Sequence, residues 1–337
     1  MAQEEGKEKE IVADLHIHSR FSRATSKNIA IDNLERYAKI KGLNLLGTGD
    51  FQHAAWFKEL NELEERDGLL FTKSGFPFLW QSEISLMYTQ GGKGRRIHFV
   101  LLAPNKEVVK QITSFLGSKG RLDYDGRPIF GFSAIELVDE MQKIDKNIEI
   151  IPAHAWTPWF GIFGSQTGFD SLKECFQEKT DKIHAIETGM SSDPEMNWRI
   201  KELNDKSIVS FSDSHSFWPW RMGREATIFT GKMSYENILK QIRENKMKAT
   251  VETDPAYGKY HWDGHRLCNF SSSPQKTKEI NGICPICNKP LIIGVENRVE
   301  ELADNYKGFM PKSAKPFYKI LPLHELIALA KASTLSS

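Results

Sequence analysis

Two hydrophobic patterns alternate along the chain up to residue 252. The first consists of short runs rich in Val, Ile, Leu and Phe, which are bounded by Gly, Pro, Asp or Ser and are typical of β-strands. These runs cover residues 11–15, 43–47, 78–88, 96–103, 148–152, 183–188 and 207–212, with weaker examples at 226–230 and 249–252. The second consists of apolar residues three and four positions apart, as in Ile31, Leu34 and Ala38, which is typical of amphipathic helices.

This alternation favours an α/β fold with a mostly parallel sheet, either closed into a barrel or open and doubly wound. Two local signals agree with the predicted elements. Gly42 stands where a helix beginning near Ile31 would end. The stretch Gly91-Gly92-Lys93-Gly94 is typical of a turn between two strands of a hairpin.

The pattern ends after Asp254, where Pro, Gly and Ser become frequent and three of the four cysteines occur. We therefore expect an α/β domain over residues 1–255, a small metal-stabilised module over 256–295 and a helical C-terminal region over 296–337. The fourth cysteine, Cys175, falls in a predicted helix over residues 170–177 and is expected to be a buried apolar side chain.

Composition and charge exclude several classes of protein. Of the 337 residues, 40% are hydrophobic and 26% are charged, which is unlike a disordered, collagen-like or disulfide-scaffold chain. The 45 Lys and Arg nearly balance the 44 Asp and Glu, so an anionic partner must be held by a local patch or by bound metal. Because no apolar run is long enough to span a membrane and the N-terminus lacks the apolar segment of a signal peptide, we expect no membrane association and a cytoplasmic location.

The clustered cysteines have the spacing of a zinc site. His265 and Cys268 form an H-x2-C pair, and Cys284 and Cys287 form a C-x2-C pair fifteen residues further on. Such pairs point two ligands at one tetrahedral ion, so we expect a structural zinc. The fourth ligand is either His265 or His261.

A second set of nitrogen and oxygen donors follows the predicted strands. Most of its members lie at or just past the C-terminal end of a strand, which is the face on which barrel active sites are built. Two pairs are spaced i, i+2, so each can turn two donors toward one ion. The mixture suits two or three Zn, Mn or Fe ions better than Ca or Mg. The donors are His16, His18, Asp50, Glu83, His98, His154, Asp213 and His215.

These donors are carried by motifs that resemble those of the PHP (polymerase and histidinol phosphatase) superfamily. The motifs are Asp14-Leu15-His16-Ile17-His18-Ser19, Thr48-Gly49-Asp50, the single residues Glu83, His98 and His154, and Asp213-Ser214-His215. The resemblance covers residues 11–252 and implies a distorted seven-stranded β/α barrel with a trinuclear metal centre. With the zinc module added, the chain resembles the endonuclease Q family of DNA-repair nucleases.

The resemblance implies a ligand set for each ion. His16, His18, Glu83 and Asp213 would hold the first metal, Glu83 would bridge to a second metal held with His98 and His154, and Asp50 and His215 would hold a weaker third. Two departures from the family pattern affect the third position. Aspartate stands at residue 50 where many members have histidine, and Ala24 stands near the place of a further ligand. His53 either compensates as a ligand, or supports a ligand without touching the metal, or lies on the surface.

The loop of residues 155–168 follows the expected ligand His154 and combines aromatic, glycine and small polar residues. Such a loop suits a flipped base, which needs stacking surfaces and hydrogen-bonding groups; alternatively it is a lid packed by its own aromatics. Arg95 and Arg96 of the predicted hairpin would hold DNA phosphates. The candidate substrate contacts are therefore Trp156, Trp159, Gln166, Thr167, Ser171, Arg95 and Arg96.

The resemblance implies hydrolysis of the phosphodiester 5′ of a deaminated base (uracil, hypoxanthine or xanthine) or of an abasic site. Damaged DNA would be the partner, Glu83 and Asp213 the catalytic residues, and Zn²⁺ the active-site ion, with Mg²⁺ or Mn²⁺ as alternatives for catalysis. Whether a sliding clamp or other repair factor binds is not readable from the sequence. The alternatives are a phosphatase acting on a small phosphomonoester and a non-catalytic nucleic-acid-binding subunit. The zinc module and the long aromatic loop favour DNA over a small substrate.

Overall fold

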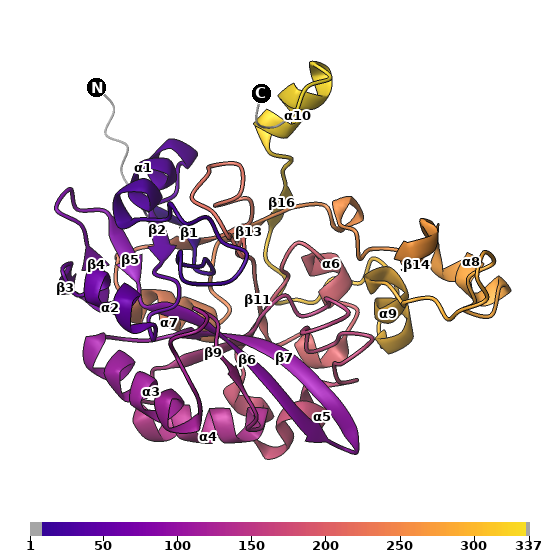
Figure 1. The fold of residues 1–337 in the computed structure, drawn as a ribbon, viewed down its shortest axis with the longest axis horizontal. Coiled ribbons are helices and arrows are strands. Elements are labelled where there is room, and N and C mark those ends of the chain that lie inside the picture. Colours follow the sequence, from indigo (N-terminus) through magenta and orange to yellow (C-terminus); the bar gives the residue numbers. More distant parts are fainter. Residues whose placement is uncertain (1–8, 335–337) are drawn as a thin grey trace.

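The computed structural model describes residues 9–334, and Figure 1 shows how its helices and strands are arranged. The strands are β1 (Glu10–Asp14), β2 (Leu45–Gly47), β3 (Glu64–Arg66), β4 (Leu69–Phe71), β5 (Pro77–Leu79), β6 (Gln81–Gln90), β7 (Lys93–Leu102), β8 (Ile129–Phe130), β9 (Glu149–Pro152), β10 (Ala185–Glu187), β11 (Ser207–Val209), β12 (Ala226–Thr230), β13 (Ala249–Glu252), β14 (Asp263–His265), β15 (Phe270–Ser272) and β16 (Phe317–Lys319). The helices are α1 (Ile31–Lys41), α2 (Ala54–Leu60), α3 (Lys106–Lys119), α4 (Ala134–Ile144), α5 (Leu172–Phe176), α6 (Pro194–Asn197), α7 (Tyr235–Arg243), α8 (Pro274–Glu279), α9 (Val295–Leu302) and α10 (Leu323–Ala330).

The strands of the barrel form a ring in the order β1, β2, β5, β7, β9, β10 and β11, and β6 directly continues β5. Each of these strands or its immediate extension contributes buried apolar side chains to one shared cluster, including Ile11, Leu45, Leu79, Val100 and Ile151. Neighbouring residues on the same strands point outward into a second cluster shared with the helices, as Leu46 and Leu101 do. This period of two is what a closed sheet with an apolar interior requires, and it confirms the predicted distorted barrel.

The barrel is distorted because its hydrogen bonding is interrupted. One sheet runs in the order β16-β13-β12-β1-β2-β5-β4-β3, another in the order β8-β6-β7-β9, and β10 pairs with β11 alone. The gap between β9 and β10 is bridged where Ala155 N–H donates to Glu187 O at 3.0 Å. On the other side, Ser212 N–H donates to the Asp14 carboxylate at 3.0 Å, which ties the end of β11 to β1.

Most predicted elements are confirmed, and the differences have local reasons. The run predicted at residues 78–88 is divided at Trp80 into β5 and β6. Strands β6 and β7 are antiparallel, joined by Gly91 and Gly92, whose φ values of 61° and 73° are those of a tight hairpin turn. The sheet is therefore more mixed than the predicted, mostly parallel one. Gly42 caps α1 with a φ of 90°, as expected.

The C-terminal region differs from the two helices that the sequence predicted. In addition to α9 and α10 it contains β16, which pairs in parallel with β13 and extends the barrel sheet. Arg298 of α9 donates to the carbonyls of Phe163 and Phe169 at 3.0 and 3.2 Å, so α9 is packed against the aromatic loop. Cys175 is completely buried in α5, as predicted. Over residues 9–334, none of the helices combines the length and the apolar character needed to cross a membrane.

Candidate metal centre and cysteine module

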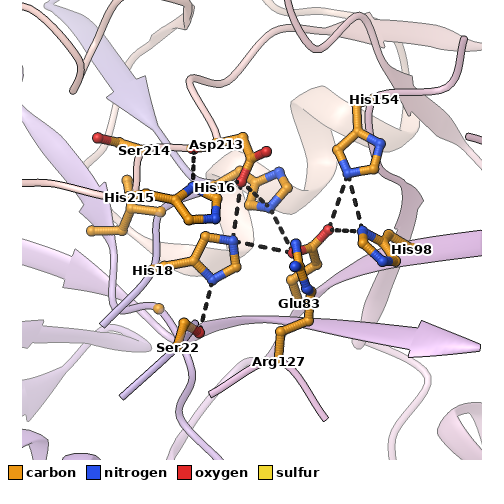
Figure 2. A network of polar contacts seen from close by, with 12 residues as sticks. His16, His18, Ser22, Glu83, His98, Arg127, His154, Asp213, Ser214 and His215 are labelled. Carbon is orange, nitrogen blue, oxygen red and sulfur yellow. Dashed lines mark hydrogen bonds and ion pairs between the residues drawn. The ribbon is translucent and has the colours of Figure 1, made fainter. Parts of the chain in front are cut away.

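The ends of distant strands bring six of the predicted donors together at one mouth of the barrel (Figure 2). His16 and His18 follow β1, Glu83 lies on β6, His98 on β7, and His154 and Asp213 follow β9 and β11. The backbone turns sharply at two of these positions, because His154 has a φ of 32° and Asp213 a φ of 48°. Non-glycine residues rarely adopt such values, and residues that do so cluster at functional sites.

Gly189 permits the close approach of β10 to His154. A Cβ at residue 189 would lie 2.3 Å from the His154 Cβ, and the φ of Gly189 is 60°. Any other residue would therefore displace His154 or strain the backbone.

The first donor group consists of His16, His18, Glu83 and Asp213. His18 Nε2 lies 3.0 Å from Asp213 Oδ1 and 3.1 Å from Glu83 Oε2. His16 Nε2 lies 3.6 Å from each of the same two oxygens. This nitrogen is buried and has no hydrogen-bond partner among residues 9–334. A buried polar atom costs free energy unless it is bonded, so a cation among these donors fits the site.

The second donor group consists of Glu83, His98 and His154. Glu83 Oε1 lies 2.8 Å from His98 Nδ1 and 3.2 Å from His154 Nε2, and these two nitrogens are 3.2 Å apart. Glu83 therefore presents one oxygen to each group, which is the geometry of a carboxylate that bridges two ions. Imidazole and carboxylate donors suit Zn, Mn or Fe.

Further residues hold the imidazoles in orientation. His16 Nδ1–H donates to Glu187 Oε1 at 2.8 Å, and the other Glu187 oxygen accepts from the His154 backbone N–H at 2.7 Å. The second nitrogen of His154 lies 3.1 Å from the Thr157 hydroxyl. Metal-binding histidines are typically fixed by such a bond from the other ring nitrogen.

Two further residues of the site, Glu187 and Arg127, were not predicted from the sequence patterns. Glu187 ends β10, so an acidic residue at a strand end was the available signal. Arg127 Nη1 lies 3.0 Å from Glu83 Oε2, but Arg127 occupies an irregular segment before β8 and no sequence pattern pointed to it.

Asp50 and His215 lie outside both donor groups, although His215 Nδ1 is 3.6 Å from Asp213 Oδ1, so the third metal assigned to them stays a prediction. Asp50 lies on the opposite side of the His18 ring from Glu83, 3.2 Å from His18 Nδ1, and its other oxygen accepts from the N–H and hydroxyl of Ser19 and from the Ser22 hydroxyl. It therefore orients His18 rather than facing the centre. His215 packs against the His18 ring at 4.5 Å.

His53, the proposed substitute ligand, stacks on Phe21 with ring centroids 4.2 Å apart. It does not belong to either donor group. The ring contact assigns it to packing around the mouth of the barrel.

The electrostatics keep the carboxylates of the centre ionised, and against burial these carboxylates raise the pKa of His16 and His18 well above the ordinary value, so a bound cation would displace protons from the two imidazoles. Burial alone would raise the pKa of Glu83, but the positive charge of Arg127 and the neighbouring histidines hold it well below its ordinary value. Burial also opposes ionisation of Asp213, yet His16 and the hydrogen bond from His18 keep its pKa below the usual range. Burial lowers the pKa of His98 to about 4, against the attraction of Glu83, so this imidazole is neutral at pH 7.

The cysteine module brings four predicted zinc ligands within 4.8 Å of one another: His265, Cys268, Cys284 and Cys287. His265 Nδ1 lies 3.1 Å from Cys268 Sγ and 3.3 Å from Cys287 Sγ. His261 does not belong to this group; its ring packs on Trp262 at 4.8 Å. The geometry therefore favours His265 as the fourth ligand.

Two candidate substrate contacts are instead part of the interior. Trp156 is 1% exposed, packs on Phe163 at 4.9 Å and donates its Nε1–H to Asn197 at 2.7 Å. Arg95 is 4% exposed, lies 2.6 Å from Glu174, and donates to the Gly168 carbonyl. Both residues stabilise the fold from inside, and neither presents its side chain on the surface in this structure.

The remaining candidates keep some exposure. Gln166 and Arg96 are exposed, and Trp159 and Thr167 are half-buried. Ser171 caps α5, where its hydroxyl accepts from the Glu174 N–H at 3.0 Å. The aromatic loop is therefore packed by its own side chains at one end and open at the other.

A cavity of about 440 Å³ opens beside the donor groups and is lined by Asp213, His215, Ser26, Arg221 and Arg224, among others. We call it the Asp213 cavity. Asp213 is the most exposed member of the donor groups, with 30% of its side chain accessible. The site can therefore admit a ligand from this side.

The chain is similar to two solved endonuclease structures. One is the lesion-specific endonuclease PfuEndoQ from Pyrococcus furiosus, with 31% identity and a TM-score of 0.86 over 98% of this chain and 80% of that one. The other is endonuclease Q in complex with a 27-mer duplex that carries an abasic lesion at the active site, with 32% identity and a TM-score of 0.87 over 98% and 81%.

Curated relatives carry no assigned function. An uncharacterized protein of Methanocaldococcus jannaschii is 37% identical over 182 residues, which are 52% of this chain but only 22% of that protein. The uncharacterized protein YqxK of Bacillus subtilis is 27% identical over 326 residues, which are 90% of this chain and 80% of that one. No protein-family model matches the chain.

Proposed function

Because the chain belongs to the endonuclease Q family, we propose that it is a metal-dependent endonuclease that incises DNA at a damaged nucleotide. The observation that carries the proposal is the pair of donor groups that share Glu83 at the mouth of the barrel. Within the first group, the buried Nε2 of His16 has no hydrogen-bond partner among residues 9–334, which supports a cation at this place.

His16, His18, Glu83 and Asp213 would hold one ion, and Glu83, His98 and His154 a second. Bound divalent ions would lower the pKa of a water molecule and polarise phosphate oxygens. Zn²⁺ suits the imidazole-rich groups, and Mg²⁺ or Mn²⁺ are alternatives in catalysis. The cysteine module would hold a structural Zn²⁺ through His265, Cys268, Cys284 and Cys287.

The buried and the exposed residues of the centre would have different roles. Glu83 is fully buried and paired with Arg127, so it fixes the two donor groups relative to each other. Asp213 borders the Asp213 cavity and would orient the attacking water by accepting a hydrogen bond from it. Glu187 fixes the positions of the His16 ring and the His154 backbone relative to each other, because each of its two oxygens accepts a hydrogen bond from one of them.

We propose hydrolysis on the 5′ side of a deaminated base or an abasic site, which leaves a 3′-hydroxyl and a 5′-phosphate. Damaged and mispaired nucleotides cost less free energy to unstack, which favours their extrusion from the duplex. The open end of the aromatic loop, with Trp159, Gln166 and Thr167, is the surface on which the extruded nucleotide would be recognised.

The test is incubation of labelled duplexes that carry uracil, hypoxanthine, xanthine or an abasic site, with Mg²⁺, Mn²⁺ or Zn²⁺, followed by mapping of the cut. We expect metal-dependent nicking 5′ of the lesion and no cut in the undamaged duplex. Asp213→Asn should lower the rate at least about 100-fold with an unchanged fold, because it removes a charged donor. The exposed Asp205→Asn is the matched control. Turnover of a simple phosphomonoester without nicking would instead establish a phosphatase.

A further inference from the structure

Arg224 is a buried arginine whose guanidinium is poorly satisfied. The residue is 6% exposed and lies in the irregular segment between β11 and β12. Its Nε is buried without a hydrogen-bond partner among residues 9–334. Its Nη2 lies 3.3 Å from both carboxylate oxygens of Glu325. A charge-assisted bond is normally about 2.7–2.9 Å long, and arginine fits an oxyanion best with two parallel bonds.

Arg224 stands between the metal centre and α10. It lines the Asp213 cavity on one side, and on the other it lines a second cavity of about 480 Å³ together with Tyr257 and Glu325. Arg221, which is exposed, lines both cavities as well. The side chains of Arg221 and Arg224 therefore line both the cavity beside the donor groups and the cavity beside α10.

Helix α10 places a carboxylate against these positive charges while it remains weakly attached. Only Glu325 and Ala328 of the helix are buried, and Leu323 and Leu329 are each 71% exposed. Figure 1 shows α10 standing away from the body of the barrel. Little apolar area is buried, and the contacts that hold the helix include the Arg224 pair, a hydrogen bond of Tyr257 to Glu325 and the packing of His324 on Trp220 at 5.1 Å.

We propose that Arg224, assisted by Arg221, binds a backbone phosphate of the DNA beside the metal centre, and that Glu325 occupies the place of this phosphate when DNA is absent. A phosphate offers the paired oxygens that a guanidinium fork requires, and it would engage the donors that Glu325 leaves unbonded. Strand binding would then release Glu325 and α10 from Arg224. The inference rests on the proposed function, because it assumes DNA as the ligand.

The test measures binding of a fluorescent duplex with a stable abasic-site analogue, with every variant placed in the Asp213→Asn background so that no cleavage occurs. Glu325→Gln should bind about 5-fold more tightly, because it removes the competing charge. Arg224→Gln should bind about 10-fold more weakly. The slope of the logarithm of its binding constant against the logarithm of the salt concentration should become shallower by about one, which corresponds to the loss of one phosphate contact. In the double variant the gain from Glu325→Gln should vanish, because that gain acts through Arg224.

Glu300→Gln is the control, since Glu300 pairs with Arg199 at 2.6 Å and lines neither cavity. If Arg224→Gln does not fold, Arg221→Gln takes its place with an expected 3-fold loss. Unchanged or weaker binding by Glu325→Gln, or a gain that persists in the double variant, overturns the inference. Nicking by the otherwise unaltered enzyme is measured in parallel. If nicking fails but the binding pattern holds, the phosphate site stands and the proposed nuclease function falls.

Discussion

At the scale of single residues, the centre depends on groups that fix the donors as much as on the donors themselves. Glu187 bonds His16 through one oxygen and the His154 backbone through the other, at 2.8 and 2.7 Å. Asp50 bonds His18 on the ring nitrogen opposite the centre. These carboxylates select which nitrogen of each imidazole faces a metal ion.

Glu187→Gln is predicted to weaken metal binding about 10–100-fold, because an amide holds the imidazole less firmly than a carboxylate does. Metal titration followed by calorimetry would measure the change, and excess metal should restore nicking. Glu149→Gln is the matched control. Glu149 is also a buried glutamate bonded to a histidine, with His184 at 3.0 Å, but it lies outside the donor groups. Equal losses in both variants would mean that Glu187 has only a general structural role.

Two buried carboxyl groups near the end of β13 make the stability of the fold depend on pH. Burial raises the pKa of Glu252 to about 8, against hydrogen bonds from Thr250, Thr188 and Ser210, and burial with the charge of Glu252 raises that of Glu225. Between the ordinary value of 4.5 and about 8, the folded state keeps the Glu252 proton that the unfolded chain releases. The free energy of unfolding therefore falls as the pH rises through this window.

Glu252→Gln should remove that dependence, since the amide does not titrate. Relative to the parent protein, the melting temperature of the variant is expected to rise by about 3–5 °C between pH 5 and pH 8. Thermal unfolding at four pH values would measure it, with the exposed Glu236→Gln as the control. A constant difference across this range would contradict the prediction.

At the scale of elements, the cysteine module illustrates how short segments obtain stability without a large core. Strands β14 and β15 have three residues each, and α8 has six. The side chains of Leu267 and Ile286, beside the ligands, are 89% and 63% exposed. With so little apolar area buried, a bound metal is expected to supply most of the folding free energy of the module.

His265→Ala is therefore predicted to lower the zinc content by about one ion per chain and to increase proteolysis between residues 263 and 292. His261→Ala is the paired control, because His261 lies outside the ligand group. Elemental analysis of both purified variants would measure the difference. Loss of zinc from the His261 variant alone would reverse the assignment of the fourth ligand.

At the scale of the whole molecule, metal binding by the two donor groups would join parts of the barrel that the hydrogen bonding leaves separate. The donors come from β6 and β7 of one sheet and from segments that follow β1, β9 and β11. An ion held by both sides would therefore act as a crosslink across the interruptions of the ring.

Removal of metal by a chelator should lower the melting temperature and abolish nicking together. At a free metal concentration of 100 times the dissociation constant, each site stabilises the fold by about 2.7 kcal/mol, so a loss of several degrees is expected. Scanning calorimetry before and after chelation, and again after Zn²⁺ or Mn²⁺ is restored, would measure it. Full activity of the metal-free protein would contradict the metal-dependent mechanism.

The sequence by itself determined most strands of the ring and the donor types, because hydrophobic periodicity and strand-end placement are local properties of the chain. The choice of a barrel over an open sheet came from the resemblance of the donor motifs to the PHP superfamily. The sequence also predicted the three cysteine ligands of the zinc site and left His265 and His261 as alternatives for the fourth. It could do so because a single turn of the chain brings ligands three residues apart together. Only the tertiary structure decided that Asp50 faces away from the centre, that Trp156 and Arg95 are buried, and that Glu187 and Arg127 contact the donors. Those outcomes depend on which segments of the ring meet across long sequence separations and on which atom of each side chain faces the neighbour, and no local spacing encodes either.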